Sequence, residues 1–363
     1  MSNALIPDLI IIGGGVAGLA CAQRLLEQGA AVTLLERGEI GRESSWAGGG
    51  ILSPLCPWDY PAEVTRLTSR SAAQFASWTA ALHAATGIDP EYELSGMLVL
   101  PPFDAGTAQQ WCVGHGVALQ QVNDTLSANP AGALLLPEVA QVRNPRLVQA
   151  LRQQVLSLGG KIVAHCAVQG LLTEGGCVQA LATACGEQRA GRYIVTAGAW
   201  SKQVLGKHAL QLDIKPIRGQ MLLFKFDAPP LRHIVLQDGM YLIPRRDGHL
   251  LVGSTLEDVG FDKSTTLAAR DSLWQRAQLL LPQLRNMPLL QHWSGLRPAS
   301  PHNIPTIGRH PQLENLYINS GHFRYGVTMA PASVEILLNE LNGGAQPFDV
   351  APYRAGWGSA IAR

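Results

Sequence analysis

The chain has 363 residues, of which 47% are hydrophobic and 15% are charged, and its formal net charge at pH 7 is +1. This length allows about two domains with substantial cores, and the composition excludes an intrinsically disordered chain. The balanced charge gives no reason to expect a nucleic acid or an anionic membrane as a partner.

The six cysteines form neither a CxxC pair nor a zinc-binding spacing, and several lie inside apolar runs. This pattern is typical of small buried thiols in a reducing compartment, so we expect a cytoplasmic protein without a metal. No positive region precedes the first apolar run, so no signal peptide is expected. That run, residues 9–22, contains three consecutive glycines and falls short of the ~20 residues of a membrane span.

Residues 8–36 have the pattern of a strand, a glycine-rich turn, a helix, a second strand and a closing acid. The apolar run 9–12 is followed at once by Gly13-Gly14-Gly15-Val16-Ala17-Gly18, then by helix formers up to Gly29 and by the apolar run 31–35. Together these features predict a dinucleotide-binding unit rather than a glycine-rich loop of another α/β protein.

Each chemical feature that such a unit needs has a candidate residue here. Gly13 allows the tight turn, Gly15 lets a pyrophosphate approach the backbone, and Gly18 lets the helix pack closely on the strand. The helix N-terminus offers amides to phosphate. Glu36 is placed to accept hydrogen bonds from an adenosine ribose; it disfavours a 2′-phosphate, although the adjacent Arg37 weakens that argument.

A loop of small hydroxyl residues and glycines, residues 37–52, follows the second strand. Such a loop suits either a flexible linker or a contact with phosphate and a planar ring. Its position just after the dinucleotide unit favours contact with the cofactor.

The remaining predicted helices and strands fall alternately into two structural blocks. Helix 63–85 completes the first block, and strands around Gly96 with a short helix at 107–114 open a second. Helix 145–158, strand 161–168, a hairpin at 170–187 and strand 192–200 resume the first block. Strands at 217–226, 233–244 and 249–254 and helix 266–281 resume the second. Strand 316–321 and helix 329–342 close the first, and a tail after Gly343 is mostly loop.

This order predicts an α/β fold with two domains, each discontinuous. A Rossmann-like FAD-binding domain takes residues 1–85, 145–215 and 295–363. An α+β substrate domain with a mainly antiparallel sheet takes residues 86–144 and 216–294.

Several motifs along nearly the whole chain resemble the D-amino-acid-oxidase-type flavoproteins, and within them the glycine oxidases. They are Gly13–Gly18 with Glu36, the loop 42–52, Thr196-Ala197-Gly198-Ala199-Trp200, Tyr241-Leu242-Ile243-Pro244-Arg245, Trp293-Ser294-Gly295-Leu296-Arg297-Pro298, Ile307-Gly308-Arg309 and Gly321-His322-Phe323-Arg324-Tyr325-Gly326. The set is specific to the superfamily and less specific to the glycine oxidases.

The resemblance implies FAD rather than NAD as the cofactor. It assigns the ADP half to Val16, Ala17, Glu36, Arg37 and Val168. It assigns the flavin half to Ser44, Ser45, Gly49, Gly50, Ile51 and the turn formed by His322, Phe323, Arg324, Tyr325, Gly326, Val327 and Thr328. Related sarcosine oxidases tether the flavin through a late cysteine. Because no cysteine follows Cys185, we expect FAD to be bound non-covalently.

An amino-acid oxidase must hold a carboxylate, and Arg297 is the candidate because a guanidinium grips it bidentately. Tyr241 would add a hydroxyl hydrogen bond, and Arg324 would lie near the same pocket. The non-functional alternatives are that the arginine forms a surface ion pair and that Tyr241 is an ordinary aromatic residue of the core. No general base is assigned: His322 and His292 are candidates by pKa class, but a lone histidine is more often structural. Leu256, Ile51 and Met240 are candidates to line the pocket.

The expected function is therefore an FAD-dependent oxidase of glycine and small amines such as sarcosine or D-alanine. Its products would be glyoxylate or iminoacetate, ammonia and hydrogen peroxide, feeding the thiazole branch of thiamine biosynthesis. The resemblance also implies a homotetramer. Two alternatives stay open: a D-amino-acid or proline dehydrogenase that reduces a quinone, and a flavoprotein of tRNA modification, which the balanced charge disfavours.

Overall fold

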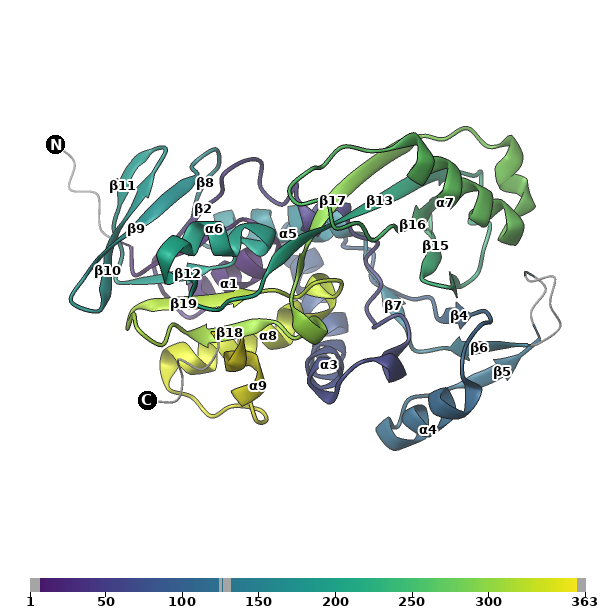
Figure 1. Cartoon of the computed structure of the whole chain (residues 1–363), viewed down its shortest axis with the longest axis horizontal. Helices are drawn as coiled ribbons and strands as arrows, with labels where there is room; N and C mark the ends of the chain where they lie inside the picture. The colour runs from purple at the N-terminus through teal and green to yellow at the C-terminus, as the bar shows by residue number, and fades with distance from the viewer. Residues whose placement is uncertain (1–6, 124–125, 127–131, 358–363) are drawn as a thin grey trace.

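The structure, a computed structural model, describes residues 7–123, 126 and 132–357. Two large sheets organise this part of the chain (Figure 1). The three-stranded sheet β9–β11 lies at one end of the molecule in this view, while α4 and α7 lie toward the other.

The first large sheet has six strands in the order β18-β19-β12-β1-β2-β8. Only the edge strand β18 is antiparallel to its neighbour; the other pairs are parallel. The four inner strands β19, β12, β1 and β2 are short and almost entirely buried, as the interior of a parallel sheet requires, whereas the edge strands β8 and β18 are partly exposed. Their bounds are β1 Leu9–Ile12, β2 Val32–Leu35, β8 Lys161–Val163, β12 Arg192–Val195, β18 Thr306–Arg309 and β19 Leu316–Ser320.

Different elements cover the two faces of this sheet. Ile11 and Leu34 pack against helices, whereas their neighbours Ile10 and Leu35 pack on the opposite face, because strand side chains alternate. The helices on the first face are α1 (Val16–Glu27), α3 (Ala62–Thr86), α5 (Asn144–Ser157) and α8 (Gly326–Asn342). The opposite face carries α6 (Ser201–Leu205) and the antiparallel strands β9 (Val168–Glu174), β10 (Cys177–Thr183) and β11 (Gly186–Gln188).

The second large sheet has eight strands in the order β17-β13-β16-β15-β14-β4-β6-β5, and the pair β14–β4 is parallel. Helix α7 (Leu267–Leu280) packs on one face and α4 (Ala105–His115) on the other. The strands are β4 Met97–Val99, β5 Gln120–Val122, β6 Ala133–Leu136, β13 Lys215–Lys225, β14 Ile234–Gln237, β15 Met240–Pro244, β16 His249–Gly253 and β17 Gln291–Ala299.

Three details differ from the sequence-based expectation. The strands flanking Gly96 do not form one pair: β3 (Glu93–Leu94) pairs with β7 (Ala140–Gln141), whereas β4 joins the eight-stranded sheet. The segment 233–244 is a hairpin of β14 and β15. The tail after Gly343 contains a short helix, α9 (Ala351–Arg354), whose Tyr353 is fully buried, because it packs into the core beside α8.

Strand β17 runs across the domain boundary that the sequence suggests between residues 294 and 295, since it continues to Ala299. It pairs with β13 along its whole length, from Gln291 to Ala299. None of the helices in the described ranges has both the length and the apolar character that a membrane crossing requires.

Candidate active site

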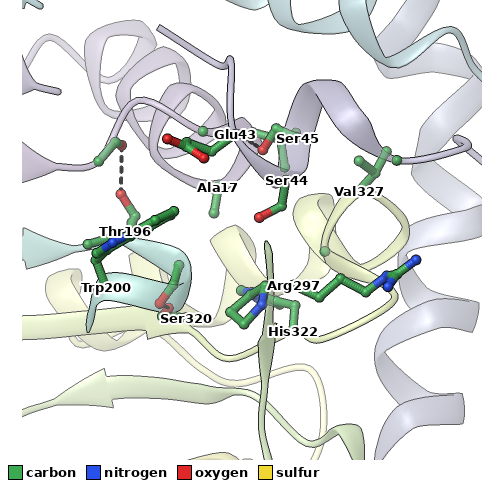
Figure 2. A pocket seen from close by; sticks show the side chains of 18 of the residues that line it. Ala17, Glu43, Ser44, Ser45, Thr196, Trp200, Arg297, Ser320, His322 and Val327 are labelled. Carbon is green, nitrogen blue, oxygen red and sulfur yellow. Dashed lines mark hydrogen bonds between the residues drawn. The ribbon is translucent and has the colours of Figure 1, made fainter. Parts of the chain in front are cut away.

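A cavity of about 480 Å³ opens where the carboxyl ends of the parallel strands meet. Gly13, Glu36, Thr196 and Ser320 end or follow β1, β2, β12 and β19, and all four residues line it. This edge is where open α/β sheets bind ligands, and the volume lies in the roughly 300–1,000 Å³ range of small-molecule sites. Figure 2 shows Ala17 and Ser44 facing Arg297 and His322 across the cavity.

The glycine-rich turn is packed too closely for side chains. A Cβ on Gly13, whose φ is +116°, would lie 2.5 Å from the Thr196 carbonyl oxygen, and one on Gly18 would lie 2.0 Å from the Gly13 carbonyl oxygen. The Thr196 hydroxyl donates to that same Gly13 oxygen over 2.9 Å. Helix α1 then begins at Val16 without a side-chain cap and without an acidic residue in its first turn. Its N-terminus is therefore suited to an anion.

Glu36 is held by the turn that it closes. Its two carboxylate oxygens accept hydrogen bonds from the amides of Gly14 (2.8 Å) and Gly38 (2.9 Å), and the side chain is buried at the cavity wall. The Val16 amide donates to the Ser45 hydroxyl over 2.9 Å. The loop after β2 is thus tied to the start of α1.

Charged and aromatic groups cover the same end of the cavity. The guanidinium of Arg37 lies 3.5 Å above the ring of Trp200 and pairs with Glu43 at 2.8 Å. Glu43 also pairs with Lys263, and Phe261 packs on Trp200, so the segment between β16 and α7 contacts two residues that line this end of the cavity. These surface ion pairs contribute little individually, about 0–1 kcal/mol.

The fully buried Arg245 holds the second glycine-rich loop. Its guanidinium donates to the carbonyl oxygens of Gly49 (2.7 Å) and Val142 (2.9 Å) and to the side-chain oxygen of Gln141 (2.7 Å). Burial lowers its pKa to about 10, with the nearby Arg143 acting in the same direction. A Cβ on Gly50 would lie 2.1 Å from the Val142 carbonyl oxygen, so this loop also packs without space for side chains.

The turn before α8 forms the wall opposite α1. Residues 322–325 of this turn and the first three residues of α8, 326–328, all line the cavity. The Tyr325 hydroxyl hydrogen-bonds the Tyr60 hydroxyl and accepts from the Leu55 amide, and Thr328 donates to the Ile51 carbonyl oxygen over 3.0 Å. Two segments far apart in the sequence are therefore joined at the site.

His322 is the buried histidine of this wall. It is 4% exposed, and its Nε2 atom has no hydrogen-bond partner among the described residues. Burial lowers its pKa to about 4, so the imidazole is neutral at pH 7. The other candidate, His292, lies outside the cavity lining and is hydrogen-bonded through Nε2 to the Gln220 side chain.

Three candidate substrate residues meet in the cavity: Arg297 from β17, Tyr241 from β15, and Arg324 from the turn before α8. Arg297 donates to the Thr255 carbonyl oxygen (3.1 Å) and the Ser254 hydroxyl (2.6 Å). Burial lowers its pKa; the adjacent Tyr241 opposes this effect and Arg324 adds to it.

The sulfur of Met221 and the backbone of β13 contact the other side of these residues. The Tyr241 hydroxyl donates to the sulfur of Met221 over 3.3 Å. A Cβ on Gly219 would lie 2.0 Å from Nη1 of Arg297, so the guanidinium rests directly on the backbone of β13.

Every cofactor candidate of the sequence analysis except Gly18 lines this one cavity, and Gly18 packs α1 against the turn instead. Ile51 also lines the cavity, but Met240 and Leu256 do not. Met240 points to the α7 face because its neighbour Tyr241 points to the cavity, and Leu256 is 51% exposed beyond the end of β16.

Sequence reasoning assigned no role to several lining residues. They include Glu43, Asn144, Cys166, Thr196, Trp200, Asn319 and Ser320. Thr196 and Ser320 could have been predicted from the sequence, because polar residues at the ends of parallel strands gather at one edge of the sheet. Asn144 begins a helix and carried none.

The fold and the cavity define a dinucleotide-binding protein of the Rossmann type, and comparison with known proteins identifies its family. Residues 8–339 match the family described as FAD dependent oxidoreductase. The chain belongs to this family.

Particular relatives share most of its length. The chain is 43% identical to the glycine oxidase of Pseudomonas aeruginosa over 95% of this chain and 97% of that protein. It is 32% identical to the bifunctional protein ThiO/ThiG of a Nostoc species, over 91% of this chain and 52% of that protein. The crystal structure of glycine oxidase from Geobacillus kaustophilus superposes with a TM-score of 0.91 at 25% identity, over 96% of this chain and 97% of that one.

The residues present fit FAD, which is the cofactor of this family. The uncapped start of α1 and the absence of an acid in its first turn suit a pyrophosphate. Asn319 Oδ1 and His322 Nε2 are buried in the cavity wall without partners in the described part of the chain, so a polar ligand would satisfy them. Gly13, Gly49 and Gly50 also line the cavity and present bare backbone there, which a phosphate or a planar ring can approach closely.

Proposed function

We propose that this chain is an FAD-dependent oxidase of glycine and small amines such as sarcosine or D-alanine. Glycine would yield glyoxylate through an imine, together with ammonia and hydrogen peroxide. The observation that carries this proposal is the half-buried Arg297 guanidinium, which lines the same cavity as the dinucleotide-binding turn. Similarity to glycine oxidases over nearly the whole chain supports it.

The residues of the chain would bind and orient the substrate. Arg297 uses two of its five N–H groups on Ser254 and Thr255 in the described structure, which leaves donors for a carboxylate. Arg324 adds positive charge at the same place, and Tyr241 would turn its hydroxyl from Met221 to the carboxylate. FAD, when bound, supplies the two-electron acceptor that dioxygen regenerates.

No residue is assigned as a proton acceptor. The neutral His322 lies in the wall, and its pKa of about 4 makes it a weak base. An amine that binds in its neutral form would need no protein base, so orientation by Arg297 is the main contribution of this chain.

The test is Arg297→Ala with peroxide readout on a panel of glycine, sarcosine and D-alanine. Loss of a charge-assisted pair costs about 3 kcal/mol, so the KM for glycine should rise by about a hundredfold or more. Arg285→Ala, at an exposed arginine in the same part of the chain, is the control and should leave KM unchanged. An unchanged KM in Arg297→Ala would remove this residue from the site. Absence of peroxide under air, with reduction of a quinone instead, would replace the oxidase by a dehydrogenase.

The proposal extends to organisation and context. The division into an FAD-binding domain (1–85, 145–215, 295–363) and a substrate domain (86–144, 216–294) is supported by the two large sheets, whose strands fall almost entirely within these segments. Non-covalent binding of FAD and a cytoplasmic location are part of the proposal; the described cysteines are all free thiols, which supports the location. Similarity to the ThiO/ThiG protein supports a place in the thiazole branch of thiamine biosynthesis. A homotetramer is expected from the resemblance and is tested by light scattering.

A further inference from the structure

Cys166, which lines the cavity, and the exposed Cys185 lie at the same end of the antiparallel pair β9–β10. Val168 of β9 pairs with Thr183 of β10, and the amide of Ala184 donates to the Ala167 carbonyl oxygen over 2.9 Å. Extending this antiparallel register by one residue sets Cys166 opposite Cys185. Both residues contact Thr183: the Cys166 thiol donates to the Thr183 hydroxyl over 3.3 Å, and the Cys185 amide donates to the same hydroxyl over 3.1 Å. Directly opposed Cβ atoms lie about 4.5–5.5 Å apart, and a disulfide requires about 3.5–4.5 Å, so a small movement suffices.

The two thiols have different environments. Cys185 is exposed on the turn between β10 and β11, where a small oxidant reaches it from solvent. Cys166 is buried, lines the cavity, and donates to the Thr183 hydroxyl over 3.3 Å. An accessible thiol beside a second thiol is the pairing in which a sulfenic acid on the first is resolved to a disulfide by the second.

We propose that Cys166 and Cys185 form a disulfide when hydrogen peroxide accumulates, and that this disulfide weakens binding of FAD. The source of the oxidant rests on the proposed function, because an oxidase releases hydrogen peroxide beside this pair. Cytoplasmic disulfides of this kind are transient and regulatory rather than structural.

The chemistry balances with peroxide as the only oxidant. The Cys185 thiolate attacks one peroxide oxygen, the O–O bond breaks, and hydroxide leaves to give a sulfenic acid. The Cys166 sulfur then attacks the Cys185 sulfur, the S–S bond forms, the S–O bond breaks, and water leaves. Two thiols lose two electrons, and one peroxide becomes two waters. Interaction with the neighbouring Cys166 thiol, and then burial, raise the pKa of Cys185, so the thiolate is scarce and the disulfide forms over many turnovers.

The expected effect on FAD binding follows from the contacts that Cys166 and its neighbours make at the cavity. Its amide donates to the Glu36 carbonyl oxygen over 2.8 Å, and its neighbours Ala167 and Val168 line the same end of the cavity. Forming the S–S bond requires Cys166 to leave the Thr183 hydroxyl and move toward the turn. The segment that faces the proposed adenosine end would move with it, so the affinity for FAD should fall several-fold and recover with a thiol reductant.

The linkage is read by peptide mass spectrometry on the holoprotein. Trypsin leaves Cys166, Cys177 and Cys185 in one peptide, residues 162–189, so a second cut after Glu174 with a glutamate-specific protease is needed. After peroxide treatment and alkylation, the fragments 162–174 and 175–187 should stay joined without reductant and separate with it. Cys177→Ser, which removes the other cysteine of the second fragment, should keep the link, and Cys185→Ser should abolish it. Recovery of Cys166 as a free thiol, or a link through Cys177, would overturn the disulfide.

The cofactor effect is measured separately, as the Kd for FAD from flavin fluorescence. Peroxide should raise the Kd of the wild-type chain several-fold and leave that of Cys185→Ser unchanged. An unchanged Kd in fully linked protein would overturn the coupling to the cofactor site.

Reagent peroxide in the absence of glycine tests the disulfide, whereas glycine and air with or without catalase test its source. If the disulfide forms with reagent peroxide but not with glycine and air, the disulfide is supported and the proposed oxidase is rejected as the source of the peroxide. If it forms in neither experiment, the disulfide itself is rejected.

Discussion

The guanidinium of Arg297 rests on the bare backbone of Gly219, with no room between them for a methyl group. Gly219 lies on β13, and Arg297 lies on the neighbouring strand β17. A Cβ at residue 219 would lie 2.0 Å from Nη1 and 2.3 Å from Cζ of Arg297. The position of the guanidinium that we propose to bind the carboxylate is therefore set by a glycine that does not itself line the cavity.

Gly219→Ala should displace the Arg297 guanidinium and raise the KM for glycine. A misplacement of about 1 Å in a positioning group costs roughly a hundredfold, so we expect a rise in KM between tenfold and a hundredfold. The matched control is Gly114→Ala in α4, where a Cβ meets no atom within 4 Å. Steady-state kinetics with peroxide detection measures both variants; equal KM values would show that the guanidinium does not depend on this contact.

Tyr241→Phe should raise the KM for glycine about two- to tenfold, because one neutral hydroxyl hydrogen bond contributes roughly 0.5–1.5 kcal/mol. The ring and its packing in the core are kept. Tyr193→Phe is the control: its hydroxyl donates to the Gln179 carbonyl oxygen away from the cavity, so it should cost stability and leave KM unchanged. If both variants kept the wild-type KM, Tyr241 would be a core aromatic rather than a substrate residue.

His322 should make the folded state sensitive to acid. Its pKa is lowered from 6.5 to about 4 in the folded chain, because burial disfavours the imidazolium. As the pH falls below 6.5 the unfolded chain binds a proton that the folded chain does not, so stability is complete above pH 6.5 and is lost toward pH 4. Between pH 7 and pH 5 this amounts to about 2 kcal/mol.

Urea unfolding of the apoprotein at the two pH values measures this effect. His322→Asn should lose about 2 kcal/mol less than the wild type on acidification, whereas the exposed His83→Gln should behave like the wild type. An identical loss in all three proteins would show that His322 is not the group that titrates.

The parts of the fold that sequence reasoning obtained are those fixed by local pattern. Apolar runs of four residues, a glycine turn and a helix bounded by Gly29 define β1, α1 and β2 without reference to the rest of the chain. The pairing of β3 with β7 could not be obtained in this way, because the partners lie more than forty residues apart and each strand has only two residues. Short strands carry too little periodicity to predict a partner.

The residues of the candidate site also separate into those that local pattern predicts and those that depend on long-range packing. Met240 was a poor candidate for the pocket once Tyr241 was chosen, because neighbours on a strand face opposite sides, so this error was avoidable. The Arg297–Gly219 contact was not accessible, since it depends on the register between β13 and β17. The same holds for Arg245, whose partners Gly49, Gln141 and Val142 are brought to it only by the packing of the two sheets.

Arg245 and Arg246 are adjacent in the sequence and should differ sharply in their contribution to stability. Arg245 is buried, and its hydrogen bonds go to neutral oxygens of Gly49, Gln141 and Val142. Arg245→Met removes these donors and leaves buried acceptors unpaired, so we expect a loss of roughly 3 kcal/mol or more and a weaker affinity for FAD, because Gly49 lines the cavity. Arg246 is about half exposed and pairs with Glu93 at the surface, so Arg246→Met should cost less than about 1 kcal/mol. Urea unfolding and FAD titration of the two variants decide the matter: free energies of unfolding within about 1 kcal/mol of each other would mean that Arg245 does not hold the loop.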